Sequence, residues 1–431
     1  MNPELRRNFW LELTLHRMLA LPAGLVLAFM LAYSWAKEDP GETLATTAMT
    51  LFLGFSLWGA LQAGDAVRGE VRGRTWDGQR MSAIEPWAMT WGKLVGAPAF
   101  AWYGGLICLA AYVLFSPSVY ALKAMLFLFS GAVLVQALAL NGSVIAARRG
   151  VARSTSSIWV IVLAFVVVGP WMSALTSGDA DISWWGRGWR RIDFMLSSTV
   201  VFAAWAVFGA HRLLCQELRV RTLPWAWVVF LAYAAFYIAG FGIRPYDTLA
   251  QQKNVLLIAG MIVSLAATYP MLFSDIGGAM AVRRLLLRAA HRQWRRLLEE
   301  TPLWPVTLVL AALFCLATVV LAGSAGSNEF LRPLVLAPLP LLLLAVRDAA
   351  LFLFFAFARQ PRRAETAALF YLVLLYWLVP MLLRAVGLEG VSDLVLPPFW
   401  ERPGVATAVA AVQAAAMVAA AAWRWRKNYG S

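Results

Sequence analysis

The sequence predicts an all-α polytopic membrane protein of about 12 transmembrane helices in two parallel six-helix repeats, preceded by an N-terminal interfacial amphipathic helix. Of its 431 residues, 61% are hydrophobic and only 14% are charged, and the mean hydropathy is +0.68. Soluble domains contain about 25% charged residues. Apolar stretches of roughly 20 residues recur along the chain, each long enough to cross about 30 Å of hydrocarbon. Lys and Arg gather in alternate segments between these stretches.

Each apolar stretch is expected to be a helix, because a backbone in lipid must satisfy its own hydrogen bonds. The first six spans are expected at 18–36, 45–64, 93–116, 121–146, 155–176 and 195–214. The second six are expected at 224–242, 254–274, 303–323, 332–357, 366–386 and 404–423.

The basic residues predict the orientation. With the N-terminus inside, the inner segments hold most of the 37 Lys and Arg residues, and the positive-inside rule then places both termini in the cytoplasm. This placement accounts for much of the net charge of +14, so no nucleic-acid partner is expected. We expect an integral protein of a bacterial inner membrane.

Cysteine and histidine carry little information. Cys108, Cys215 and Cys315 lie within or at the ends of apolar stretches and show no paired spacing. A disulfide framework or a zinc site is therefore not expected. The three histidines are scattered on the flanks of the spans, where interfacial roles are commoner than metal binding.

The two halves of the chain are expected to be copies. The stretches 147–163 and 358–375 both bring a basic turn into a following span. An offset of about 214 residues superimposes the span boundaries, as in proteins with internal repeats. The predicted transmembrane domains are 18–221 and 222–431. Because six is an even number, the copies share one orientation and their symmetry axis runs along the membrane normal.

Residues 1–17 are expected to form an amphipathic helix in the membrane interface. Its apolar residues fall at helical spacing, opposite the charged ones: Leu5, Phe9, Trp10 and Leu13 against Arg6, Arg7 and Glu12. The alternative is a cytoplasmic extension of the first span.

The polar segment 66–93 separates the second and third spans. In it Glu70 precedes Thr75, ten residues separate Thr75 from Pro86-Trp87, and four more separate that pair from Gly92-Lys93. This ordered set resembles the permeases of ATP-binding-cassette (ABC) exporters of the ABC-2 superfamily. Arg74 stands where that family usually has a glycine before the threonine.

The resemblance implies the transmembrane permease of an ABC exporter, moving a substrate across or out of the membrane. ATP and Mg would be bound and ATP hydrolysed by separate ATPase subunits, two copies or a heterodimer. This chain has no Gly-x-x-x-x-Gly-Lys-Ser/Thr loop, so we expect no cofactor in it and no enzymatic activity of its own. The residues that the resemblance assigns to ATPase coupling in this segment are Glu70, Arg72, Arg74, Thr75, Trp76, Pro86 and Trp87.

A coupling role for segment 66–93 can also be argued on physical grounds, independently of the family resemblance. A membrane domain driven by a soluble motor needs a rigid cytoplasmic knob, and we expect a short coupling helix over 66–84. Pro86 would end that helix and fix the turn into the third span. Trp87 and Trp91 would anchor at the headgroups, and Lys93 would neutralise lipid phosphates. The alternative is an ordinary basic loop held by its tryptophans.

The equivalent segment of the second half, 275–302, lacks the Pro-Trp and Gly-Lys pairs. It carries Arg284, Arg288 and Arg292 at helical spacing. One interpretation is a degenerate coupling helix for the second ATPase, and the other is a helix resting on anionic lipid.

Arg347 and Asp348 are expected near the middle of the tenth span, where charge is costly and often functional. Adjacent residues point about 100° apart on a helix, so each is expected to pair with a neighbour rather than with the other. They are candidates for a substrate pathway or gate. The alternatives are a structural ion pair or a span placed too shallow.

Two other functions remain open. A secondary transporter with two six-span repeats would need coupling-ion residues in the membrane, where few acidic residues besides Asp348 are expected. A membrane-embedded transferase would need clustered carboxylates or histidines on one face. The substrate is beyond what the sequence predicts, because function lies in the site and not in the fold.

Overall fold

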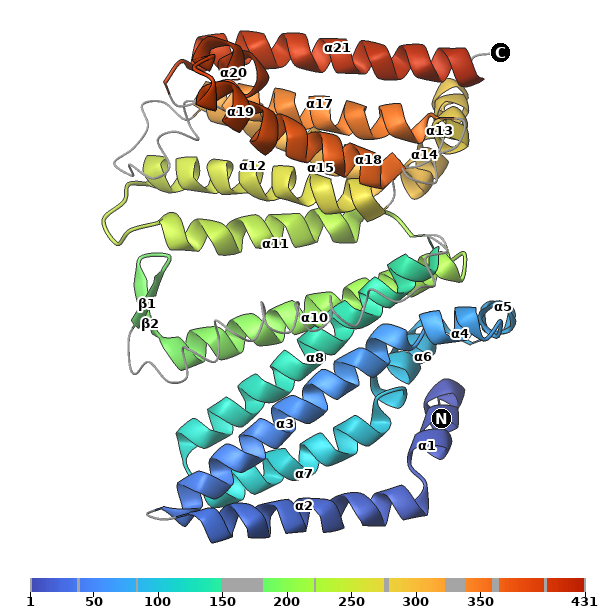
Figure 1. Ribbon diagram of the computed structural model, residues 1–431, viewed down its shortest axis with the longest axis vertical. Helices are drawn as coiled ribbons and strands as arrows, with labels where there is room; N and C mark the ends of the chain where they lie inside the picture. Colours follow the sequence, from blue (N-terminus) through green and yellow to red (C-terminus); the bar gives the residue numbers. More distant parts are fainter. Residues whose placement is uncertain are drawn as a thin grey trace. The chain divides into compact units, whose positions relative to one another are not determined.

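A computed structural model of the chain describes residues 2–36, 39–82, 84–148, 181–220, 222–274, 279–321, 338–358, 364–398 and 401–429. Its internal contacts divide the chain into two compact units. The first comprises Met1–Ile182 and Gly188–Thr222, and the second comprises Ser183–Arg187 and Leu223–Ser431. Long helices form the body of each unit (Figure 1).

The first unit places short helices at one end of a bundle of long ones (Figure 1). Its long helices are α2 (Leu15–Trp35), α3 (Pro40–Asp65), α7 (Ala99–Phe115), α8 (Val119–Arg148) and α10 (Arg191–Glu217). Its short elements are α1 (Pro3–Glu12), α4 (Arg68–Arg72), α5 (Trp76–Met81), α6 (Pro86–Trp91) and the π-helical turn η1 (Gly92–Gly96).

The second unit has the same general build. Its long helices are α11 (Trp225–Gly242), α12 (Leu249–Ser274), α15 (Leu303–Leu321), α17 (Pro338–Ala356) and α21 (Pro403–Tyr429). Two shorter helices, α18 (Ala364–Val373) and α19 (Val379–Ala385), are joined by the π-helical turn η3 (Leu374–Leu378). The remaining helices are α13 (Ala279–Ala290), α14 (Trp294–Glu300) and α20 (Glu389–Val395).

Helix pairing recurs from one unit to the other. In the first, α3 packs on α2 and α7, and α8 packs on α10. In the second, α12 packs on α11 and α15, and α17 packs on α21. The pairs occur in the same chain order. This recurrence accords with the predicted duplication, which stays a prediction.

Ten helices of the described part of the chain are long and apolar enough to cross a membrane, or eleven if a bent pair counts as one span. The ten correspond to expected spans one, two, four and six to twelve, and the bent pair corresponds to the third. The fifth, 155–176, lies outside the described residues. The apolar side chains of α2 are largely exposed, as expected where lipid is the solvent. The protein is therefore an all-α polytopic membrane protein in its main architecture.

The third span is not the single straight helix expected over 93–116. The pair Pro86–Gly96 and Ala99–Phe115 bends by 60°. Pro98 stands at the break, where it donates no backbone hydrogen bond and closes off the π-helical turn before it.

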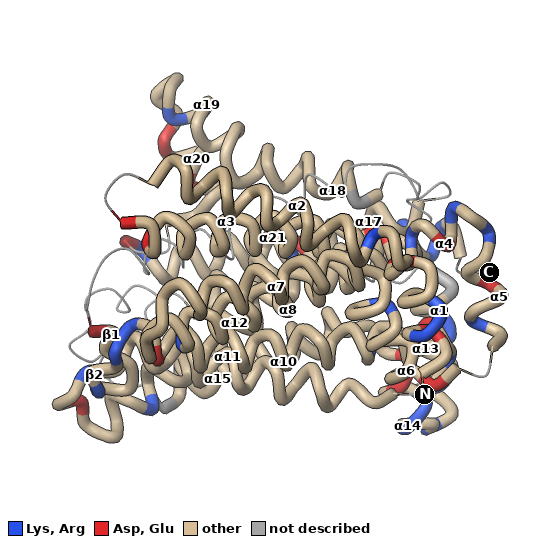
Figure 2. The backbone as a smooth tube through the Cα atoms, turned by 90° about the horizontal axis from the view of Figure 1, so that it is seen from below, with Lys and Arg blue, Asp and Glu red and all other residues tan. Residues whose placement is uncertain are grey.

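Charged residues mark the ends of the long helices. In each unit Lys, Arg, Asp and Glu gather near the ends of the bundle, and the middles of the long helices are nearly free of them (Figure 2). This distribution is the one expected for helices whose middles lie in hydrocarbon.

One described segment departs from the helical expectation. Strands β1 (Asp181–Trp184) and β2 (Arg187–Arg190) form a hairpin before α10. The turn residues Trp185 and Gly186 both have positive φ, 53° and 68°, as tight hairpins require. The tip belongs to the second unit, where Trp184 Nε1 donates to the Tyr237 carbonyl at 3.0 Å.

Candidate functional site

The segment after α3 folds as two short helices and not as the single coupling helix expected over 66–84. Helix α4 ends in a hydrogen-bonded turn in which the Arg74 amide donates to the Val71 carbonyl at 3.2 Å and the Thr75 amide donates to the Glu70 carbonyl at 2.9 Å. Helix α5 starts directly after it. The turn breaks the helix because Arg74 adopts a left-handed backbone, with φ at 57°.

The backbone of this turn favours glycine at position 74, which is the residue that the resemblance leads one to expect there. Left-handed backbone costs a residue with a side chain about 1–2 kcal/mol. Glycine adopts it without that cost, which is why helices commonly end on it. The position keeps the geometry of the turn but not its preferred residue.

We expect Arg74→Gly to raise the free energy of unfolding by about 1 kcal/mol, because it removes the cost of left-handed backbone, less the extra freedom of glycine in the unfolded chain. The thermal unfolding midpoint of the detergent-purified protein measures it. Arg72→Gly is the control: Arg72 is the last residue of α4, has a helical backbone and pairs with Asp65, so glycine there should lower the midpoint. A lower midpoint for Arg74→Gly would contradict the prediction.

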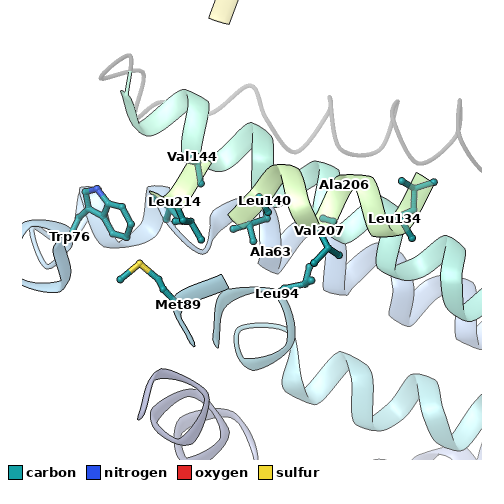
Figure 3. Close-up of a cluster of buried hydrophobic side chains, with 14 residues drawn as sticks. Ala63, Trp76, Met89, Leu94, Leu134, Leu140, Val144, Ala206, Val207 and Leu214 are labelled. Atoms are coloured by element: carbon teal, nitrogen blue, oxygen red, sulfur yellow. The ribbon is translucent and has the colours of Figure 1, made fainter. Parts of the chain in front are cut away.

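An apolar cluster seats this segment on the long helices. Trp76 of α5, Met89 of α6 and Leu94 of η1 are buried against Leu140 of α8 and Leu214 of α10 (Figure 3). The three short elements are therefore packed on the bundle and do not form a loose loop. Packed elements of this kind transmit displacement instead of absorbing it.

A buried ion network lies beside this cluster. Lys93 is 1% exposed, and its Nζ donates to Glu70 Oε2 at 2.6 Å, to Gln79 Oε1 at 2.9 Å and to Glu4 Oε1 at 3.1 Å. Arg7 Nη2 lies 2.9 Å from both Glu4 Oε1 and Glu70 Oε1. Two cations thus face two carboxylates, as a buried charge requires.

Helix α1 is fastened to the segment through the same network. Asn8 Nδ2 donates to the Gly92 carbonyl at 2.9 Å, and Asn2 Nδ2 donates to the Ala88 carbonyl at 2.6 Å. A Cβ on Gly92 would come within 2.3 Å of Glu4 Cγ, so only glycine permits this approach. The polar face of α1 meets the protein, and Trp10 is left 83% exposed on another side.

Arg68, the first residue of α4, adds a second buried cation to the first unit. Its Nε donates to the Gly64 carbonyl at 2.8 Å, and its Nη2 lies 3.9 Å from Asp65 Oδ1. Burial lowers the pKa of its guanidinium, and the Asp65 charge opposes that shift. The Ser143 hydroxyl accepts from the Arg68 amide at 3.3 Å and ties the start of α4 to α8.

These contacts correct three expectations for the segment. Lys93 does not neutralise lipid phosphates, because its side chain is enclosed by Glu4, Glu70 and Gln79. Trp76 is buried and Glu70 turns inward to Lys93, so neither side chain is presented to a partner. Burial in the apolar cluster and pairing with a buried cation are the physical reasons.

Proline and tryptophan act differently from expected at the next helix. Pro86 is the first residue of α6 and opens a helix instead of ending one, as suits a residue that lacks an amide hydrogen. Trp87 stacks on His211 of α10, with ring centroids 3.8 Å apart and planes 7° apart. Its ring therefore joins the segment to α10 while one side stays exposed.

The side of the segment that faces away from the bundle is polar. Its exposed residues are Arg72, Gly73, Arg74, Thr75, Asp77, Gly78, Met81 and Ser82, which we call the knob surface. Met81 is 83% exposed at the end of α5. The site thus combines a rigid, buried base with an accessible polar tip.

The equivalent segment of the second unit is a hairpin of two helices. Helix α13 ends at Ala290, and Arg292 adopts the same left-handed turn as Arg74, with φ at 52°. Arg292 therefore does not continue the helical row of Arg284 and Arg288, contrary to expectation. Arg288 pairs with Glu300 of α14 at 2.5 Å, which ties the two helices together.

Arg347 and Asp348 lie within α17 and are 4% and 0% exposed. They pair with each other, contrary to expectation: Arg347 Nη2 donates to Asp348 Oδ1 at 2.8 Å. The hydroxyls of Tyr269 and Tyr376 donate to Asp348 Oδ2 at 2.8 and 2.7 Å. Arg347 Nη1 donates to Gln413 Oε1 at 2.6 Å. The long arginine side chain folds back along its own helix, which allows a pairing that the 100° between neighbours argues against.

This network joins four elements of the second unit. Tyr269 belongs to α12, the charged pair to α17, Tyr376 to η3 and Gln413 to α21. Gln413 Nε2 also donates to the carbonyls of Leu394 and Val395 at the end of α20. Every oxygen of the Asp348 carboxylate has at least two donors, so the pair is held as a closed structural unit.

The sequence alone missed several members of both networks. Glu4, Asn8 and Gln79 carry no motif, and Tyr269 and Tyr376 resemble other span tyrosines. The one available signal was the acid in the first turn of α1, which faces the buried Lys93.

Among the described residues, no group of His, Cys, Asp and Glu is arranged to hold a metal ion. Comparison of the chain with protein-family models, with curated proteins and with solved structures finds no match.

Proposed function

We propose that the chain is the transmembrane permease of an ABC exporter in a bacterial inner membrane, with both termini in the cytoplasm. Separate ATPase subunits bind beneath it and hydrolyse ATP, and a substrate is moved across or out of the membrane. The observation that carries the proposal is the rigid knob after α3, packed on α8 and α10 and fixed to α1 through Lys93. The resemblance of this segment to those of ABC-2 permeases suggests that the partner of the knob is an ATPase subunit.

The knob surface suits contact with a soluble motor. It offers Arg72, Arg74, Asp77 and Met81 to the aqueous phase, a mixture of charge and one flexible apolar side chain. The buried network below holds it against the third span. A push on the knob would therefore move α1 and the broken third span together, because packed elements shift as units.

The test is the affinity of a co-purified ATPase subunit for permease variants. We expect Asp77→Arg combined with Met81→Asp to weaken binding by at least about tenfold, which corresponds to about 1.4 kcal/mol. Both side chains are more than four-fifths exposed, so the unfolding midpoint should stay unchanged.

Asp181→Arg is the matched control, because Asp181 is exposed on the hairpin at the other end of the helices (Figure 1). It should leave binding intact. If no ATPase subunit co-purifies, or if the knob variant binds and transports normally, the proposal fails.

A second function, a secondary transporter, rests on one observation. Arg347 and Asp348 form a buried charged pair in a helix apolar enough to span a membrane, and charges there often line ion pathways. A closed network with two tyrosine donors favours a structural role instead. Transport that persists without ATP and follows an ion gradient would support the secondary transporter.

A further inference from the structure

We infer that the α13–α14 hairpin of the second unit is an anionic-lipid-binding element that lies on the headgroups of the membrane surface. It occupies the place in the second unit that α4 and α5 occupy in the first, between the equivalents of the second and third spans. Its exposed side chains fit a phospholipid surface and differ from those of the knob.

The exposed face of the hairpin mixes arginine with large apolar residues. On α13 the exposed side chains include Arg283, Arg284, Leu286 and Leu287. On α14 Trp294 is 59% and Leu298 49% exposed. A face turned to water is normally polar, whereas a helix lying in a membrane interface carries basic and apolar residues side by side. Tryptophan is favoured at the same depth.

The charges of the hairpin are unbalanced. Its two acids are already engaged, Glu300 with Arg288 and Glu299 with Arg295. Within the described residues, no carboxylate lies within ion-pair distance of Arg283, Arg284, Arg292 or Arg296. Guanidinium groups bind phosphate through paired hydrogen bonds. The four arginines that lack a carboxylate partner in the described part of the chain therefore complement an anionic headgroup layer.

The chain also holds the hairpin at the membrane. Only Thr301 and Pro302 separate α14 from α15, and α13 follows α12 with a short connection. Both neighbours are long and apolar enough to span. The short connections to α12 and α15 therefore keep the hairpin close to the bilayer surface.

The knob of the first unit differs from the hairpin in the pairing of its charges. There Arg72 pairs with Asp65, and Arg80 lies near Asp77 and Glu217. Met81 is 83% exposed in α5, whereas Trp87 and Trp91 of α6 are only 42% and 44% exposed. The two equivalent segments thus offer different chemistry, and the hairpin fits lipid where the knob fits protein.

The test uses the full-length protein in nanodiscs without any ATPase, so that its outcome does not depend on the proposed exporter function. A cysteine introduced as Leu287→Cys carries a bimane label, and the three native cysteines are buried. With one-third phosphatidylglycerol we expect a blue-shifted emission and quenching by headgroup-proximal spin-labelled lipid. In pure phosphatidylcholine, or at 1 M salt, most of the quenching should be lost, since salt screens charge.

Replacing Arg283, Arg284, Arg292 and Arg296 with Gln should reduce the quenching in anionic discs to the phosphatidylcholine level. These side chains are exposed, so the unfolding midpoint should hold. The control is the same label at Met81→Cys on the knob surface, whose emission should not respond to lipid charge. Emission at position 287 that ignores lipid charge overturns the inference. A shift that arises only when an ATPase subunit is added overturns it too, and makes the hairpin a protein interface.

Discussion

Lys93→Met should lower the free energy of unfolding of the protein by about 3–5 kcal/mol, the cost of removing one partner from a buried ion pair. The methionine fills a similar volume, but Glu4 and Glu70 then lose their buried cation. The loss also loosens α1, because Glu4 and Asn8 hold it to η1. The shift in thermal unfolding midpoint, measured in detergent, reports the effect.

Neutralising Lys93 together with both carboxylates should cost much less, because the remaining cation, Arg7, is 45% exposed to water. In the combined variant Glu4→Gln, Glu70→Gln and Lys93→Met no unpaired carboxylate remains, so most of the stability should return. Arg17→Met is the matched surface control: Arg17 and Glu12 are half and one-third exposed, and such pairs contribute about 0–1 kcal/mol. If Lys93→Met and Arg17→Met shift the midpoint equally, Lys93 is not enclosed as described.

Asp348→Ala should have an effect of similar size, about 3–5 kcal/mol. It leaves the Arg347 guanidinium buried with Gln413 as its remaining hydrogen-bond partner, and it removes the acceptor of the Tyr269 and Tyr376 hydroxyls. Because the network joins α12, α17, η3 and α21, the loss should be felt across the second unit. Thermal unfolding again measures it.

The double variant Arg347→Met with Asp348→Asn separates structure from transport. It removes both charges and keeps an acceptor for the tyrosines, so most of the stability should be recovered. A stable double variant that still transports indicates a structural pair. One that is stable but inactive assigns the pair to the pathway or gate. A double variant as unstable as Asp348→Ala would contradict the account of the network.

The segments after α3 and after α12 occupy the same place in the chain order of their units, but they expose different side chains. Both units place a helix–turn–helix with a left-handed arginine, Arg74 or Arg292, after the second long helix of the unit. The first is fixed by a buried network under a polar knob. The second exposes leucine, tryptophan and arginines that have no carboxylate partner among the residues that the structure describes. A motor that pushes on one and a bilayer that holds the other would give the halves unequal roles.

Spans and their approximate limits follow from the sequence because lipid acts as a solvent on each stretch of about 20 residues separately. The interruption of the third span was harder to predict. Pro98 is visible in the sequence, but the π-helical turn before it is contacted by Asn8 and Glu4, which meet Gly92 from more than 80 residues away. A local pattern does not encode such a partner.

The sequence by itself determined that this is a helical membrane protein, approximately where ten of its candidate spans lie and which segments carry its charge. Only the tertiary structure decided which charges are buried and with what. Lys93 and Glu4 are 89 positions apart, and Asp348 finds its tyrosines on two other helical elements. The reason is physical: hydropathy is a property of each stretch, whereas the pairing of a buried charge depends on which stretches the fold brings together.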